Sequence, residues 1–382
     1  MLTTKQISMT KKSIPKMFFI VGGLFLLAFL IATWKQAHNL GGWLLMGFFL
    51  SVAVGFRYYP LLKGFSFTVM IFAAVSLSMY YPQYFISIGT FRLSILIVPL
   101  MQIIMFGMGT GLSIKDFTSV VKMPKGVLVG VLCHYMVMPP VAFAITKLFD
   151  FPSEVAAGII LIGSCPNGLA SNVMTYLARA NLALSVTLTA ISTLLAPLMT
   201  PLFMQWFAGQ YVSISFWDMA WDITKIVIIP VLGGLLFNQF LHGKAKWLDE
   251  IMPLLSMLGI ALIIVVITAA GREDLLVVGP TLVVAMLLHN TSGYVLGYWL
   301  ARLIRMEERD CRTIAIEVGL QNAGLGSSLA LAMGKLSTVG LASAVFSPIM
   351  NITGSSLALW WRSRPLPEQN HKKVLIEQQH LN

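Results

Sequence analysis

One carboxylate in the sequence, Glu317, lies in the middle of a long apolar stretch. A charged side chain at the centre of a bilayer costs roughly 2.5 kcal/mol or more, so intramembrane acids usually have a partner or a function. No Lys or Arg lies at the middle of another apolar stretch. The sequence therefore predicts that Glu317 is either protonated or faces a bound cation.

Uncharged oxygen atoms accompany Glu317 as candidate cation ligands. Hard monovalent cations prefer oxygen ligands, by the same logic that governs calcium and magnesium. Ser185 and Thr189 are four residues apart on one expected helix, so both hydroxyls can face the same point. Such hydroxyls also commonly bond their own helix or a neighbouring one, which is the alternative interpretation. The other candidate oxygens belong to Ser171, Asn172 and Gln321.

Helix breakers and polar side chains interrupt the apolar pattern at 164–172 and 317–324. Pro166 removes a backbone donor and clashes with the preceding turn, and nearby glycines add backbone freedom. Unwound backbone is tolerated at membrane depth only inside the protein or beside a wet cavity. Each break also creates a half-helix N-terminus, whose free N–H groups suit an anion. Cation ligands beside anion donors predict cation-coupled uptake of an organic anion.

The composition indicates which elements must position these groups. The chain has 382 residues, of which 57% are hydrophobic and 11% charged. A soluble domain is typically about 25% charged, so a soluble enzyme, a nucleic-acid binder and a disordered protein are all disfavoured. The net charge of +11 does not gather on one segment that could bind nucleic acid. The isolated Cys133, Cys165 and Cys311 fit small buried thiols rather than a disulfide framework.

Apolar runs of about 17–25 residues, long enough to cross a bilayer, recur along the whole chain. They predict an all-α polytopic membrane protein with about twelve transmembrane helices. The expected spans are 17–34, 41–56, 65–81, 92–113, 127–147, 154–177, 183–207, 221–241, 254–271, 277–301, 313–334 and 338–361.

The two breaks occupy corresponding places in this layout. If runs three to seven form one half, about 65–207, and runs eight to twelve the other, about 221–361, each break lies in the fourth run of its half. Because each half has an odd number of runs, the second half begins on the opposite side of the membrane and is therefore inverted relative to the first. Inverted repeats with broken helices are typical of secondary transporters, whose binding site lies at the crossing. The first two runs fall outside, so we expect an N-terminal extension, 1–58.

The basic residues predict the orientation. With the N-terminus inside, twenty of the 26 Lys and Arg residues fall in cytoplasmic segments, as the positive-inside rule requires. Both termini are therefore expected in the cytoplasm, and 363–382 is expected to be a polar cytoplasmic tail. The first run is too long for a usual signal peptide and lacks a convincing cleavage site, so a retained helix is expected. These features predict a multi-pass protein of the inner cell membrane.

Three segments resemble those of a known family. The sequences CPNGLASNVMTYLARANLALSVTLTAISTLLAPLMTP (165–201), EVGLQNAGLGSSLA (317–330) and IMFGMGTGLSIKDF (104–117) are similar to signature segments of the bile acid:sodium symporter family. The similarity covers roughly 60–362, the expected symporter unit. It implies two inverted five-helix repeats that form a panel domain and a core domain, with the broken helices crossing in the core. It also implies sodium-coupled inward transport of organic anions by alternating access.

The resemblance also implies roles for individual residues. A first sodium site would be formed by Ser171, Asn172, Ser185, Thr189 and Glu317. A second would be formed by Glu317, Gln321, the carbonyls of Val318 and Leu320, and a family Gln whose position is His134 here. The family's Pro-Gly-Gly-Thr run reads Pro166-Asn167-Gly168-Leu169, which exchanges a hydroxyl for an amide. Asn322 matches a family position near the substrate, so the expected substrate residues are Asn167, Gly168, Leu169 and Asn322.

The sequence thus predicts a symporter, not an enzyme, that couples one or two sodium ions to a small organic anion, a monocarboxylate, without an organic cofactor. One alternative keeps the fold and couples to protons through His134 and Glu317. An intramembrane enzyme would need a nucleophile with a base, or a metal cluster, at depth. Only scattered serines and Cys133 beside His134 offer that. Paired broken helices argue against a channel.

Overall fold

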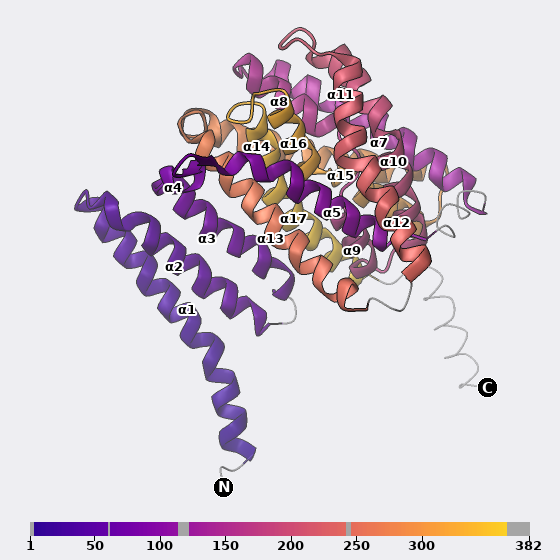
Figure 1. The fold of residues 1–382 in the computed structure, drawn as a ribbon. Helices are drawn as coiled ribbons and strands as arrows, with labels where there is room; N and C mark the ends of the chain where they lie inside the picture. Colours follow the sequence, from indigo (N-terminus) through magenta and orange to yellow (C-terminus); the bar gives the residue numbers. More distant parts are fainter. Residues whose placement is uncertain (1–3, 60–61, 114–121, 242–245, 365–382) are drawn as a thin grey trace, which may run out of the picture.

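The computed structural model describes residues 4–59, 62–113, 122–241 and 246–364, and most of them are helical. Figure 1 shows the helices packed side by side, with α1 and α2 along one edge. The helices of the first part are α1 (Thr4–Trp34), α2 (His38–Arg57), η1 (Lys63–Phe65), α3 (Ser66–Tyr80), α4 (Gln83–Ile86), η2 (Leu93–Leu96), α5 (Ile97–Thr110), α7 (Pro124–Leu148), α8 (Ser153–Ser164), α9 (Ala170–Leu177) and α10 (Leu182–Phe203).

The second part repeats long apolar helices. A π-helical segment, η3 (Met204–Ala208), extends α10, and a similar segment, η4 (Thr224–Ile228), joins two helices into one span. The helices of this part are α11 (Phe216–Ile223), α12 (Ile229–Leu241), α13 (Lys246–Ala270), α14 (Arg272–Leu303), α15 (Glu308–Gly319), α16 (Ala323–Ala332) and α17 (Gly340–Arg362).

Eight helices of the described residues are long and apolar enough to cross a membrane, which agrees with a polytopic membrane protein. Three further apolar helices are shorter, and two of them, α8 and α16, are halves of interrupted runs. The runs expected over 154–177 and 313–334 are each split into two short helices, as the helix breakers predicted. The total of twelve spans, the repeats and the orientation stay predictions.

A small hairpin precedes α5 and was not expected from the apolar pattern. Strands β1 (Ser87–Ile88) and β2 (Phe91–Arg92) pair antiparallel, and Gly89 between them has a φ of +60°. Glycine adopts this left-handed conformation without the steric cost of a side chain. The hairpin turns the chain just before the next long helix begins.

Glycines set how closely several helices approach one another. A Cβ at Gly109 of α5 would lie 2.1 Å from the carbonyl oxygen of Val231, and one at Gly234 of α12 would lie 2.1 Å from that of Phe106. At the edge of the bundle, Gly41 and Gly42 of α2 make room for the rings of Tyr80 and Tyr81. Close backbone approach through small residues is the usual way that membrane helices pack.

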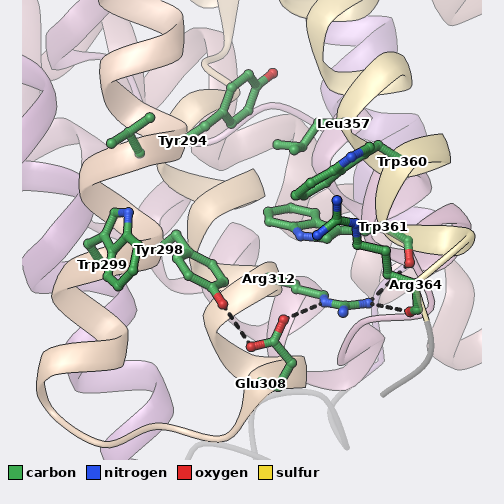
Figure 2. A pocket seen from close by; sticks show the side chains of 10 residues that line it. Tyr294, Tyr298, Trp299, Glu308, Arg312, Leu357, Trp360, Trp361 and Arg364 are labelled. Atoms are coloured by element: carbon green, nitrogen blue, oxygen red, sulfur yellow. Dashed lines mark hydrogen bonds and ion pairs between the residues drawn. The ribbon is translucent and has the colours of Figure 1, made fainter. Parts of the chain in front are cut away.

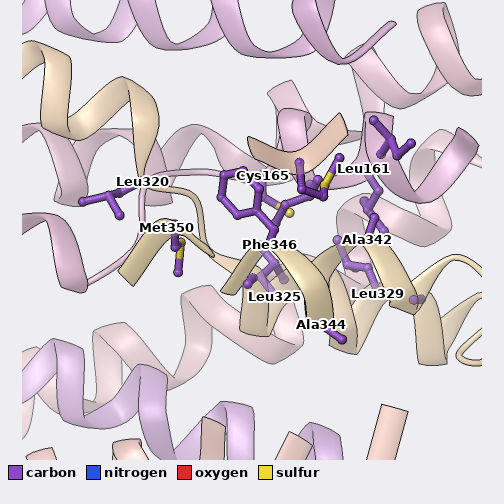
Figure 3. Packing of buried hydrophobic residues seen from close by; sticks show 14 of the residues in the cluster. Leu161, Cys165, Leu320, Leu325, Leu329, Ala342, Ala344, Phe346 and Met350 are labelled. Atoms are coloured by element: carbon purple, nitrogen blue, oxygen red, sulfur yellow. The ribbon is translucent and has the colours of Figure 1, made fainter. Parts of the chain in front are cut away.

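The buried core surrounds the two interruptions. Figure 3 shows Cys165 and Leu320, which begin the two breaks, packed with Phe346 and Met350 of α17 and with Leu325 of α16. Cys165, Leu320, Leu325 and Phe346 are all fully buried. The breaks are therefore held by dense packing rather than by lipid, which is the condition for unwound backbone at membrane depth.

Candidate functional site

The two interruptions cross as a short antiparallel pair of extended segments. The N–H of Gly168 donates to the carbonyl of Leu320 at 3.1 Å, and the N–H of Asn322 donates to the carbonyl of Pro166 at 2.8 Å. Asn167 and Gln321 are bridge partners between these two bonds. Each break thus satisfies backbone groups that the other leaves without a helical partner.

Gly168 makes this crossing sterically feasible. A Cβ at this position would lie 2.6 Å from the carbonyl oxygen of Gln321 and 3.2 Å from its carbonyl carbon. Both atoms belong to the backbone of the opposite break, so they cannot move aside as a flexible side chain would. The closeness of the two segments therefore depends on the missing side chain at this residue.

Glu317 lies in the last turn of α15 and is fully buried. Its carboxylate accepts a hydrogen bond from Nδ2 of Asn167 at 2.5 Å and one from Oγ1 of Thr189 at 3.1 Å. The hydroxyl of Ser185 donates to the other carboxylate oxygen. No Lys or Arg in the described part of the chain forms an ion pair with this carboxylate. Every partner that the structure gives it is neutral.

The other oxygens expected in the first sodium site surround the same point. The amide oxygen of Asn172 lies 2.8 Å from the Ser185 hydroxyl oxygen and 3.5 Å from the Thr189 hydroxyl oxygen. The Ser171 hydroxyl lies 3.3 Å from that of Thr189 and donates to the Gly168 carbonyl at 2.8 Å. The structure thus brings together five predicted ligands from α9, α10 and α15, and their binding of a cation stays a prediction.

A second group of polar atoms lies at the crossing. Three of its atoms are buried and have no hydrogen-bond partner among the described residues: Nδ1 of His134, Oδ1 of Asn167 and Oε1 of Gln321. Nε2 of His134 lies 3.0 Å from the carbonyl oxygen of Cys165, and Nε2 of Gln321 donates to the carbonyl of Val318 at 2.9 Å. Asn167 and Gln321 form a non-hydrogen-bonded bridge pair, the closer of the two antiparallel pair types.

The predicted substrate residues take different positions. Asn322 is buried, and its Oδ1 caps α16 by accepting from the N–H of Leu325 at 3.0 Å. Leu169 is half-buried at the start of α9. The side chain of Asn167 faces the Glu317 carboxylate, so it lies with the expected cation ligands. The roles of these residues toward a substrate stay predictions.

A supporting residue was missed at the sequence level. Nδ2 of Asn290, on α14, donates to the carbonyl of Gly319 at 2.7 Å, and its Oδ1 accepts from the Thr353 hydroxyl at 2.5 Å. Gly319 is the last residue of α15, so Asn290 helps to hold the end of that half-helix. The signal was a polar residue beside His289 in an apolar run. Nε2 of His289 lies 3.0 Å from the carbonyl oxygen of Met138.

Comparisons with known proteins agree with this arrangement. A model of the Sodium Bile acid symporter family matches residues 98–277. The uncharacterized sodium-dependent transporter YocS of Bacillus subtilis is 40% identical over 312 residues, which cover 81% of this chain and 94% of the relative. The human ileal sodium/bile acid cotransporter is 32% identical over 244 residues, which cover 62% of this chain and 69% of the relative.

A plant relative extends the range of the similarity. The probable sodium/metabolite cotransporter BASS1 of Arabidopsis thaliana is 38% identical over 266 residues, which cover 69% of this chain and 66% of the relative. All three relatives are named as transporters, which confirms that the chain is a transporter rather than an enzyme. With these similarities and the crossed broken helices, the chain belongs to the sodium bile acid symporter family.

Proposed function

We propose that this chain is a sodium-coupled symporter of a small organic anion, of the monocarboxylate class, that works by alternating access. The observation that carries the proposal is the fully buried Glu317 carboxylate, whose partners Asn167, Ser185 and Thr189 are all neutral. A buried carboxylate is costly unless a positive charge compensates it. A sodium ion supplies that charge when it binds.

The hydroxyl ligands can serve both the empty and the loaded site. A hydroxyl has one donor and two lone pairs, and its hydrogen rotates to suit its surroundings. Without an ion, Ser185 and Thr189 donate to the carboxylate. With an ion, they turn their lone pairs toward it, and Asn172 and Ser171 add two further oxygens.

A second sodium site is supported by the unpartnered atoms at the crossing. If Nε2 of His134 carries the hydrogen that bonds Cys165, its Nδ1 presents a free lone pair. Glu317 adds its carboxylate and Gln321 its amide oxygen. The Val318 and Leu320 carbonyls, which accept from Nε2 of Gln321 and the N–H of Gly168, add second lone pairs. Asn167 lies close enough through its bridge to Gln321 to join them. Imidazole is a poorer sodium ligand than an amide oxygen, so this site is the weaker of the two.

The anion would bind beside the ions at the N-termini of α9 (Ala170–Leu177) and α16 (Ala323–Ala332). Free N–H groups and the positive end of the helix dipole favour a carboxylate there. Asn167, Gly168, Leu169 and Asn322 form the adjoining segments. Because the ion neutralises Glu317, the loaded core can move between the two faces at a lower electrostatic cost than the empty one.

The proposed topology follows the basic residues and the layout of the runs. Residues 1–58 add two helices ahead of a symporter unit, 60–362, in which 65–207 and 221–361 are inverted repeats forming core and panel domains. Both termini lie in the cytoplasm, and the protein belongs to the inner cell membrane. Of the proposed cytoplasmic tail, 363–382, residues 365–382 lie outside the described residues.

Uptake by proteoliposomes tests the proposal. The purified chain is reconstituted, and organic acids chosen by a thermal-shift screen with and without sodium are offered under an imposed sodium or proton gradient. The proposal expects uptake that follows the sodium gradient at constant pH. Uptake that ignores sodium and follows pH would instead assign coupling to protons through His134 and Glu317. No hydrogen bond joins those two side chains among the described residues.

A further inference from the structure

A pocket of about 510 Å³ lies away from the crossing, where the end of α14, the start of α15 and the end of α17 meet. Figure 2 shows its walls, with Trp299 on one side and Trp360 and Arg364 on the other. Glu308 borders the pocket, nine residues before Glu317 on α15, which corresponds to about 13 Å along the helix axis. Tyr294 also lines the pocket and packs against Gly319 at the end of α15, but none of the lining residues is a proposed sodium or substrate ligand.

One wall of the pocket is apolar and faces outward. Trp299 is 58% exposed, Val295 55% and Trp360 47%. Leu357 of α17 also lines the pocket. Behind them, the rings of Tyr298 and Trp361 stack with centroids 6.0 Å apart. Exposed Trp side chains at the ends of membrane helices are typical of the headgroup region of a bilayer. Lipid chains, rather than water, are the expected neighbours of this wall.

The polar wall contains a closed network that neutralises its one acid. Glu308 accepts from Nε of Arg312 and from the hydroxyl of Tyr298, both at 2.8 Å, and Arg302 lies 3.8 Å away. The buried Arg312 also donates to the carbonyl oxygens of Trp361 and Arg364 at 3.2 and 3.3 Å. This network ties the start of α15 to the end of α17 and leaves the wall with excess positive charge.

Arg364 places a positive charge at the mouth of the pocket. Its guanidinium lies over the Trp360 ring, 4.0 Å from the centroid, and the side chain is exposed. It forms no ion pair with any carboxylate in the described ranges. Arg302, near the end of α14, does not line the pocket and pairs with Glu308 at 3.8 Å. The exposed guanidinium of Arg364 beside an apolar aromatic wall matches a phosphate attached to acyl chains.

We propose that this pocket binds an anionic phospholipid of the surrounding bilayer. The phosphate accepts hydrogen bonds from Arg364, and one acyl chain lies along Val295, Trp299 and Trp360. A bound lipid then joins the ends of α14 and α17, which hold the start of α15 through the Tyr298–Glu308 and Arg312–Trp361 hydrogen bonds, respectively. This site is independent of the proposed sodium coupling, because none of its residues belongs to either sodium site.

Lipid binding to the full-length chain tests this proposal. The delipidated protein in detergent is titrated with phosphatidylglycerol or with phosphatidylcholine of the same acyl chains, and bound lipid is counted by native mass spectrometry. We expect phosphatidylglycerol to bind at least tenfold more tightly and to raise the melting temperature. Equal binding of the two lipids would overturn the proposal.

Variants locate the site and identify the ligand. Arg364→Gln should lower the affinity for phosphatidylglycerol about tenfold, whereas Arg362→Gln, an exposed arginine two residues away on the same chain segment, should not. If Arg364→Gln does not yield folded protein, Arg364→Met, which keeps an unbranched side chain beside Trp360, replaces it. Trp299→Gln should weaken the binding of the diacyl lipid but not that of sn-glycerol 3-phosphate.

Two results would refute a lipid site. Equal losses of lipid affinity in the Arg362 and Arg364 variants would mean that diffuse surface charge attracts the lipid. Full stabilisation by inorganic phosphate or glycerol phosphate means a soluble ligand.

Discussion

Replacing Glu317 with Gln removes the charge of the buried carboxylate while keeping the length of its side chain. In the variant, the amide oxygen can still accept from Asn167, and the amide nitrogen can donate to Ser185 and Thr189 once their hydroxyls rotate. The hydrogen-bond network therefore survives, and the cost of burying a charge disappears. We expect the variant to fold and to be at least as stable as the parent in sodium-free buffer.

The expected loss falls on sodium binding. Two unit charges 4 Å apart interact by about 4 kcal/mol at an effective dielectric constant of 20, and desolvation offsets part of this gain. At about 1.4 kcal/mol for each factor of ten, the sodium affinity should fall at least 100-fold. A sodium concentration 100 times the parent's dissociation constant stabilises the parent by about 2.7 kcal/mol, but such a variant by only about 0.4 kcal/mol.

A thermal-shift titration measures this difference. The protein is titrated with sodium chloride, choline chloride keeps the ionic strength constant, and uptake is followed in parallel proteoliposomes. Glu273→Gln is the matched control, because that carboxylate is 85% exposed and pairs only with the neighbouring Arg272 at the surface. It should keep the parent's sodium response. An unchanged sodium midpoint and uptake in Glu317→Gln would refute the argument from the buried charge.

Three further perturbations probe the crossing and the extension. His134→Gln places an amide oxygen where the unpartnered Nδ1 lies, so the Hill coefficient for sodium-driven uptake should rise; an unchanged coefficient would make His134 a packing residue. Gly168→Ala places a Cβ 2.6 Å from the Gln321 carbonyl oxygen, so we expect the variant to be less stable by about 1–3 kcal/mol and to lose uptake. The control is Gly233→Ala, whose Cβ would have no neighbour closer than 3.9 Å, and it should leave the melting temperature unchanged. Deletion of residues 1–58 removes none of the proposed ligands, so uptake should persist; its loss in a folded, membrane-inserted variant would give this extension a role in transport.

Local sequence patterns predicted much of the architecture for a physical reason. Apolar runs must be long enough to span a bilayer, and breakers such as Pro166 act on the turn in which they lie. The interruptions of the two helices were therefore predicted within a few residues. The hairpin that contains Gly89 was missed, since four paired residues leave no periodic signal. The run expected over 221–241 lies within one span in the structure, which begins earlier, at Phe216, and the apolar pattern gave no sign of the π-helical turn η4 inside it.

Such local patterns predicted the candidate site only in part. Glu317 stood out because a carboxylate is rare at its depth, and Ser185 and Thr189 because their spacing places them on one helix face. Asn290 did not stand out. Its contact with Gly319 depends on how α14 packs against α15, which the spacing within either helix does not encode. The pocket beside Trp360 likewise arises only where the ends of three helices meet.

By itself, the sequence determined that this chain is a polytopic membrane protein with two broken helices and one deep carboxylate. These properties follow from local composition and from the cost of placing charge and unwound backbone in a bilayer. Only the tertiary structure decided that Asn167 faces Glu317, 150 residues away in the chain, and that its backbone crosses the second break at Gln321. The physical reason is that side chains from different helices meet through packing, and the interval between them in the chain does not fix which atoms come into contact.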